Sequence, residues 1–72
     1  MNRMRRRRLD LDISQAELSK RTGIIYSTVS RIELGIIRGT PEQRRKLARI
    51  LRVRISDLFP RDENEDAKPI HK

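Results

Sequence analysis

The apolar residues of this chain recur three or four positions apart, and no useful stretch alternates with a period of two. Residues 2–11 contain no Gly or Pro and are rich in Arg and Leu, which favour helices. They place Met4, Arg8 and Leu11 on one helical face. The pattern therefore predicts an all-helical protein without strands.

A second helix is predicted after a short break. Ser14 and Glu17 match the capping box, in which the hydroxyl accepts a backbone N–H and the Glu side chain reaches back to the cap. The helix is expected to run to about Thr22, because Gly23 supplies the left-handed turn that ends many helices. A third helix then has to begin almost at once, around Tyr26.

The third helix has an apolar stripe made by Val29 and Ile32, and Gly35 is placed to end it. Two short helices joined by a tight turn with Gly at its start form a helix-turn-helix unit, here residues 15–34. An ordinary helical hairpin has the same spacing. The spacing alone therefore does not decide the function.

A fourth helix is predicted from its start signal and its apolar repeat. Thr40 and Gln43 match a second capping box, with Pro41 at the first helical position. The apolar residues that follow at helical spacing are Leu47, Ile50 and Leu51.

The last predicted helical element is the short turn at residues 56–59, which stops at Pro60. Residues 60–72 are polar, lack aromatics and are expected to form a disordered, flexible tail. The folded domain is therefore expected to comprise residues 1–59.

Thirteen apolar residues are predicted to form the core: Met4, Leu11, Ile13, Ala16, Leu18, Ile24, Val29, Ile32, Leu47, Leu51, Val53, Ile55 and Leu58. Phe59 fits either the core or a dimer contact. Ile36 and Ile37 fall in a predicted loop, where they either pack beneath it or face a partner.

Charge and composition narrow the function. Residues 1–59 carry 15 Lys or Arg against six Asp or Glu, a net charge of +9, whereas residues 60–72 carry three against four. A body this basic favours a polyanion such as nucleic acid, the alternative being a merely solvated surface. There is no Cys, and the single His71 lies in the tail, so no metal, cofactor or enzymatic activity is expected. No apolar run is long enough for a membrane span, which favours a cytoplasmic protein.

Several short motifs occur together in this sequence. They are Ser14–Leu18, Gly23, Ser27–Glu33 with Gly35, Leu47–Ala48 with Leu51 and Val53, and Leu58–Phe59. In combination they resemble the lambdoid phage repressor and Cro family, the XRE-type helix-turn-helix regulators, over residues 4–59. The resemblance implies a compact five-helix, lambda-repressor-like domain that binds double-stranded DNA. Family members are mostly transcriptional regulators of bacteria and phages and often bind operators as dimers.

The resemblance also implies which residues contact DNA. Base edges in the major groove are expected to be contacted by Tyr26, Ser27 and Arg31. Contacts with the DNA backbone are expected from Gln15, Thr28, Ser30, Arg38, Arg5 and Arg6. For Thr28 and Ser30, as for Ser27, a plain solvent-facing helix surface is the alternative.

An ion pair between Arg8 and Glu33 is a further feature that the resemblance implies, and it is expected to be at least partly buried. Arg8 would then be structural. Its neighbours Arg5, Arg6 and Arg7 would remain available for phosphates.

Four positions depart from the family's pattern. Ile25 stands where a side-chain cap is usual at the start of the third helix, and Arg54 where the last helix usually has one. Arg44 stands where an apolar residue is frequent, and Leu34 where a polar, phosphate-facing one is common.

The predicted function is sequence-specific binding of double-stranded DNA by a small, repressor-like transcriptional regulator, with helix 26–34 in the major groove. The sequence leaves a homodimer open. The alternative is an antitoxin-type DNA-binding protein whose tail binds a partner protein, which the acidic residues within 62–66 favour. A third class, a non-specific nucleic-acid packer, would bind all duplexes alike with a steep salt dependence.

Overall fold

A computed structural model describes residues 3–59 and confirms the predicted all-helical fold with five helices. The predicted tail, residues 60–72, lies outside the described residues. The helices are α1 (Arg3–Asp10), α2 (Gln15–Thr22), α3 (Tyr26–Leu34), α4 (Pro41–Ile50) and α5 (Ile55–Leu58). No strand occurs within residues 3–59.

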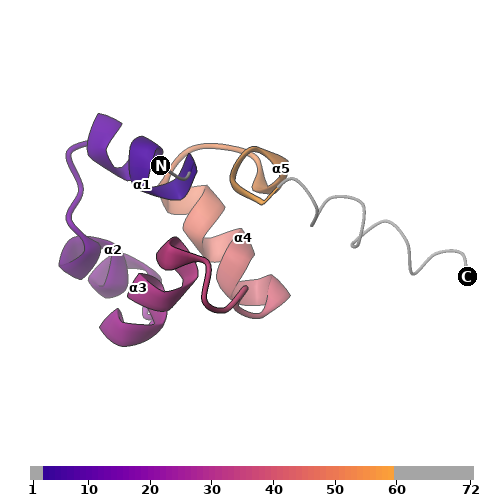
Figure 1. The fold of residues 1–72 in the computed structure, drawn as a ribbon. Coiled ribbons are helices and arrows are strands. Elements are labelled where there is room, and N and C mark those ends of the chain that lie inside the picture. Colours follow the sequence, from indigo (N-terminus) through magenta and orange to yellow (C-terminus); the bar gives the residue numbers. More distant parts are fainter. Residues whose placement is uncertain (1–2, 60–72) are drawn as a thin grey trace, which may run out of the picture.

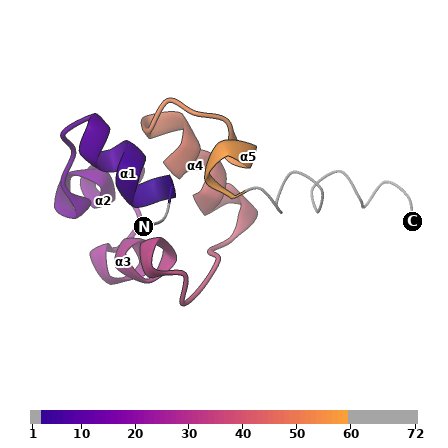
Figure 2. The same cartoon turned by 45° about the horizontal axis from the view of Figure 1, so that its top comes forward.

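The helices pack around α2, which contacts both α3 and α4. The short α5 lies against α4 and α1, so the last helix of the domain packs on the first (Figure 1). Seen from the second direction, α3 forms one edge of the molecule, with α1 and α4 on the other side of the interior (Figure 2). One side of α3 is therefore left facing outward.

The core forms where the apolar stripes of these helices meet. Four side chains in it are fully buried: Leu18, Val29, Leu47 and Leu51. Each contributes about 1.5–3 kcal/mol through removal of its surface from water. The remaining buried apolar residues are Met4, Ile13, Ile24, Ile32, Ala48 and Leu58. The predicted core residues Leu11, Val53 and Ile55 are partly buried and pack against this cluster, as do Ile50 and Phe59.

Ala16 is the one predicted core residue that the structure exposes, so its assignment to the core was wrong. The inward side of α2 is defined by Leu18 and Thr22, which are four residues apart and both buried. Ala16 precedes Leu18 by two positions, which puts it on nearly the opposite side of the helix. An alanine is small enough to be tolerated on either side.

Two helix starts show how differently similar capping sequences are used. Thr40 and Gln43 form the complete capping box: Gln43 N–H donates to Thr40 Oγ1 over 3.1 Å, and Thr40 N–H donates to Gln43 Oε1 over 3.0 Å. At α2 only half of the box forms, because Ser14 Oγ accepts from Glu17 N–H over 3.0 Å while the Glu17 carboxylate pairs with Arg21 at 2.7 Å. The nearby guanidinium is a stronger partner for the carboxylate than a backbone N–H.

Three helices end in the same left-handed turn. In these three turns the residue with positive φ is Asp12 after α1 (58°), Gly35 after α3 (81°) and Arg52 after α4 (60°). In each turn the next residue donates its N–H to a carbonyl five positions earlier: Ile13 to Arg8 (3.0 Å), Ile36 to Arg31 (2.9 Å) and Val53 to Ala48 (3.1 Å). Glycine is the usual residue here, and an arginine in this conformation costs about 1–2 kcal/mol.

Candidate nucleic-acid interface

The turn between α2 and α3 is held by two hydroxyl side chains. Thr22 Oγ1 donates to the Leu18 carbonyl over 2.8 Å and accepts the Ile24 N–H over 3.2 Å. Ser19 Oγ donates to the Ile24 carbonyl. These bonds give partners to the N–H and carbonyl groups of Ile24 in the turn. Together with the left-handed Gly23 (φ 77°), they hold the chain in the turn that leads from α2 into α3.

Neither hydroxyl was singled out in the sequence. In the sequence, the only signal for the role of Thr22 is its position one residue before the helix-ending Gly23. Its burial is seen only in the structure. The Ser19 hydroxyl is partly buried beside it.

The outward side of α3 presents the residues expected to contact bases. Ser27 and Arg31 are exposed and lie four positions apart, on the side opposite Val29 and Ile32. Tyr26, at the start of the helix, is 52% exposed. This side of α3 is therefore free of the chain's own packing within the described residues.

Thr28 and Ser30 flank this outward side and are partly exposed. The start of α3 lacks a side-chain cap: Ile25 makes none, and its carbonyl accepts the N–H groups of Thr28 and Val29. Ile25 itself is largely exposed. The helix begins through backbone bonds alone.

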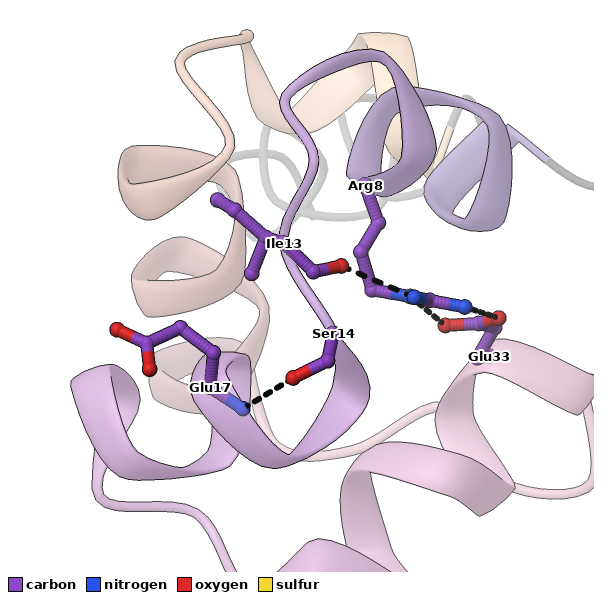
Figure 3. A network of polar contacts seen from close by, with 5 residues as sticks. All are labelled: Arg8, Ile13, Ser14, Glu17 and Glu33. Atoms are coloured by element: carbon purple, nitrogen blue, oxygen red, sulfur yellow. Dashed lines mark hydrogen bonds and ion pairs between the residues drawn. The ribbon is translucent and has the colours of Figure 1, made fainter.

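The Arg8–Glu33 ion pair is present, bidentate and buried. Arg8 Nε lies 2.9 Å from Glu33 Oε1, and Arg8 Nη2 lies 2.9 Å from Glu33 Oε2. The side chains are 9% and 2% exposed, respectively. Arg8 Nη1 also donates to the Ile13 carbonyl over 3.0 Å, so one guanidinium joins α1, the α1–α2 turn and α3 (Figure 3).

The environment of Glu33 keeps its carboxylate charged. Burial alone would raise the pKa of Glu33, but hydrogen bonds from Arg8 and Gln15, with the charges of Arg8 and Arg5, outweigh it and lower that pKa below its usual value. The hydrogen bond to Glu33 raises the pKa of Arg8, against a smaller opposing effect of burial. Both groups are therefore ionised around neutral pH.

The basic residues expected at the DNA backbone occupy two places. Arg5 and Arg6 are exposed on α1, and Arg38 is exposed in the loop after α3. Arg7 differs from its neighbours, because its Nε donates to the Leu51 carbonyl over 2.9 Å in a partly buried contact. Arg7 therefore ties α1 to the end of α4, and its contact with phosphate stays a prediction.

The loop between α3 and α4 exposes apolar side chains. Ile36 is 65% exposed and Ile37 is 39% exposed, so neither packs beneath the loop. Leu34, at the end of α3, is 68% exposed. Arg44 is buried below this loop instead and donates from Nη1 to the Gly39 carbonyl over 2.6 Å.

The comparison with known families identifies the arrangement. The family described as Helix-turn-helix matches residues 4–58, which is 55 of the 72 residues. The chain belongs to this helix-turn-helix family. The resemblance to XRE-type regulators is thereby confirmed, and the protein is a DNA-binding regulator of the helix-turn-helix class. Searches of curated proteins and of solved structures returned no match.

Two further observations concern the part of this helix-turn-helix protein that the structure describes. No group of three or more His, Asp or Glu side chains in it is arranged to hold a metal ion. None of its helices has the length and apolar character needed to cross a membrane.

Proposed function

We propose that the protein is a sequence-specific, repressor-like regulator that places α3 in the major groove of double-stranded DNA. The observation that carries this proposal is the exposure of Ser27 and Arg31 side by side on the outward side of α3. A helix-turn-helix unit uses its second helix in this way. The net charge of +9 on residues 1–59 supplies the attraction to phosphate.

The three residues expected at base edges have distinct chemical roles. Arg31 can donate two parallel hydrogen bonds to O6 and N7 of guanine, a contact that discriminates by about 1–3 kcal/mol. Ser27 can donate to or accept from a base or a phosphate. Tyr26 offers a ring for a thymine methyl group and a hydroxyl for a phosphate.

The backbone contacts would surround these three residues. Arg5 and Arg6 approach from α1, Thr28 and Ser30 from the flanks of α3, and Arg38 from the loop. At the start of α2, Gln15 would contact a phosphate. Its amide carries two N–H donors, of which the hydrogen bond to Glu33 engages one.

Selection of bound duplexes from a random pool tests the proposal. At about 150 mM salt the purely electrostatic part of binding is weakened, so only base contacts enrich a sequence. An enriched motif that Arg31→Ala relaxes at a G·C position is expected. A pool that stays random after repeated rounds would refute sequence-specific binding.

A homodimer belongs to this proposal. Two copies on one operator would place their α3 helices about 34–36 Å apart, one turn of DNA, and a palindrome in the selected motif would show it. The bound protein would then repress by excluding polymerase from the operator. A single, non-palindromic half-site would contradict the dimer and leave base recognition intact.

An antitoxin-type protein is the second candidate, and the acidic residues Asp62, Glu63, Glu65 and Asp66 favour it. In that case the tail would bind a partner protein, with ordering of the tail at the moment of binding. Deletion of residues 60–72 separates the two candidates. A regulator without a partner keeps its DNA affinity and its function in cells, whereas an antitoxin keeps its DNA affinity but no longer neutralises its partner.

A further inference from the structure

A second basic surface lies away from α3. Four of its members, Arg45, Lys46, Arg49 and Arg52, are exposed on or just after α4, and the fifth, Arg21, is exposed on α2. We call these five residues the α4 basic surface. Arg45, Lys46 and Arg49 lie on the side of α4 opposite its buried residues Leu47 and Ala48.

The members of the α4 basic surface are continuous with one another. Arg45, Lys46 and Arg49 line one shallow hollow together with Glu42. Lys46 and Arg49 line the next hollow together with Arg21, between α4 and α2. Arg21 and Arg52 both line a third hollow, beside the turn after α4, together with the acidic Asp12 and Glu17.

The acidic residues nearby neutralise only part of this charge. Glu42 lies 3.6 Å from Lys46, and Glu17 lies 2.7 Å from Arg21, both as exposed pairs one helical turn apart. Such pairs are weak, and a phosphate can replace the carboxylate. Within residues 3–59, no ion pair involves Arg45, Arg49 or Arg52.

The composition of the surface favours a nucleic-acid backbone over a protein partner. The large apolar residues that the described chain exposes lie on α1, on α3 and next to α3. None lies on α2 or α4. Protein interfaces are built on a buried apolar or aromatic centre, whereas contacts with phosphate need only positive charge.

Arg52 adds an independent observation. It holds a left-handed conformation (φ 60°) in a turn where Gly35 performs the same task after α3. An arginine is disfavoured there, because its Cβ crowds the backbone. The arginine supplies a charged side chain that a glycine in this turn would lack, and that side chain belongs to the α4 basic surface.

We propose that the α4 basic surface binds the sugar–phosphate backbone of DNA without sequence preference, independently of α3. α2 contacts both α3 and α4, and Figure 2 shows α3 at one edge of the domain and α4 on the other side of its interior. With this arrangement, we expect that a short, straight duplex bound to α3 does not reach the α4 basic surface. The protein therefore holds two segments of DNA at once.

The first test uses a short duplex of random sequence and a parent variant, Ser27→Ala/Arg31→Ala, whose α3 no longer contacts bases. Binding is measured over a range of salt concentrations. Adding Arg45→Gln and Arg49→Gln is expected to reduce the slope of log affinity against log salt by about 2, because each lost phosphate contact contributes roughly 0.9. An unchanged slope and affinity would overturn the proposal.

A matched control removes the same two charges elsewhere. Lys20→Gln/Arg54→Gln changes exposed residues outside the α4 basic surface and is expected to reduce the slope by less than half as much. Gln is a good helix former, so both variants should keep the helical signal of the parent. Equal losses in the two variants would show a general charge effect and overturn the proposal.

The second test asks for two duplexes at once. The wild-type protein is expected to capture a fluorescent duplex onto beads that carry another, and Arg45→Gln/Arg49→Gln is expected to abolish capture while single-duplex binding through α3 persists. A dimer that bridges through its two α3 helices would still capture, and that result would overturn the proposal. Stronger competition by polyglutamate than by an equal charge of random duplex would also overturn it, in favour of an acidic protein partner.

These tests do not depend on an operator. Their probe has a random sequence, so failure of the α4 basic surface leaves the selected motif of α3 untouched. Failure to select any motif would conversely leave capture by the α4 basic surface measurable.

Discussion

Glu33→Gln tests the most consequential interaction in the domain. The substitution keeps the shape of the side chain but removes the charge that two Arg8 nitrogens contact at 2.9 Å. Hydrogen bonds to a charged group contribute about 1.5–3 kcal/mol each. The new side-chain amide would also turn its N–H₂ group toward the guanidinium, so the buried positive charge of Arg8 would lose its compensation.

The expected loss of unfolding free energy is about 3–5 kcal/mol, because both side chains are nearly inaccessible to water. A domain of this size has a total of roughly 3–9 kcal/mol. The variant should therefore melt far below the wild type, or be unfolded at 25 °C. Thermal and urea unfolding followed by circular dichroism measure the difference.

Two companion variants separate charge from packing. Glu17→Gln removes an equally short but half-exposed pair with Arg21 and should cost less than about 0.5 kcal/mol. Arg8→Met combined with Glu33→Leu removes both buried charges and should recover most of the loss. A Tm for Glu33→Gln within about 4 °C of the wild type, equivalent to less than 1 kcal/mol, would refute the argument.

The same ion pair makes a prediction about acid. Because the folded protein lowers the pKa of Glu33, its contribution to stability is complete above the ordinary carboxyl range and is lost as the pH falls through the lowered value. The stability difference between wild type and Glu33→Gln should therefore be constant near neutral pH and shrink below about pH 4.5. If the stability difference between wild type and Glu33→Gln stayed constant down to pH 2, the carboxylate charge of Glu33 would not be what stabilises the wild type.

Three other substitutions test single features of the backbone. Thr22→Val should cost about 1–3 kcal/mol, because the Ile24 N–H loses its acceptor inside the turn, and a Tm equal to that of the wild type would contradict this role. Arg52→Gly should raise stability by about 1 kcal/mol, seen as a Tm increase of roughly 4–8 °C, since glycine adopts the left-handed turn freely; a fall in Tm would contradict it. Gly39→Ala should lower the free energy of unfolding by at least about 1 kcal/mol, because the added Cβ would lie 2.7 Å from Ile32 Cδ1 and the residue would have to keep a φ of 82°. An unchanged free energy in urea unfolding would contradict this.

Much of the fold was predictable because residues next to each helix end determine where that helix begins or ends. Thr40 and Pro41 at the start of α4, and Gly23 and Gly35 after α2 and α3, act within one or two turns of the chain. Such signals need no knowledge of the tertiary structure. The helix-turn-helix unit followed from them directly.

Other features depended on tertiary contacts that no local pattern encodes. Arg7 lies in a run of four arginines, and only the approach of α4 distinguishes it from its exposed neighbours. Arg44 lies on the buried side of α4, and the loop carbonyl of Gly39 accepts a hydrogen bond from its guanidinium. The Arg8–Glu33 pair joins residues 25 positions apart, and the resemblance to a family, not the spacing, pointed to it.

The two sides of α3 are chemically separate. Val29, Ile32 and Glu33 bind the helix to the rest of the domain, whereas Ser27 and Arg31 take no part in that packing. Under the proposed role of α3, retargeting this regulator to a new operator would require substitutions only at positions that contribute nothing to the packing of the domain. The DNA sequence preference could then change, by evolution or in the laboratory, through the outward side of α3 alone, while the fold of the domain stays the same.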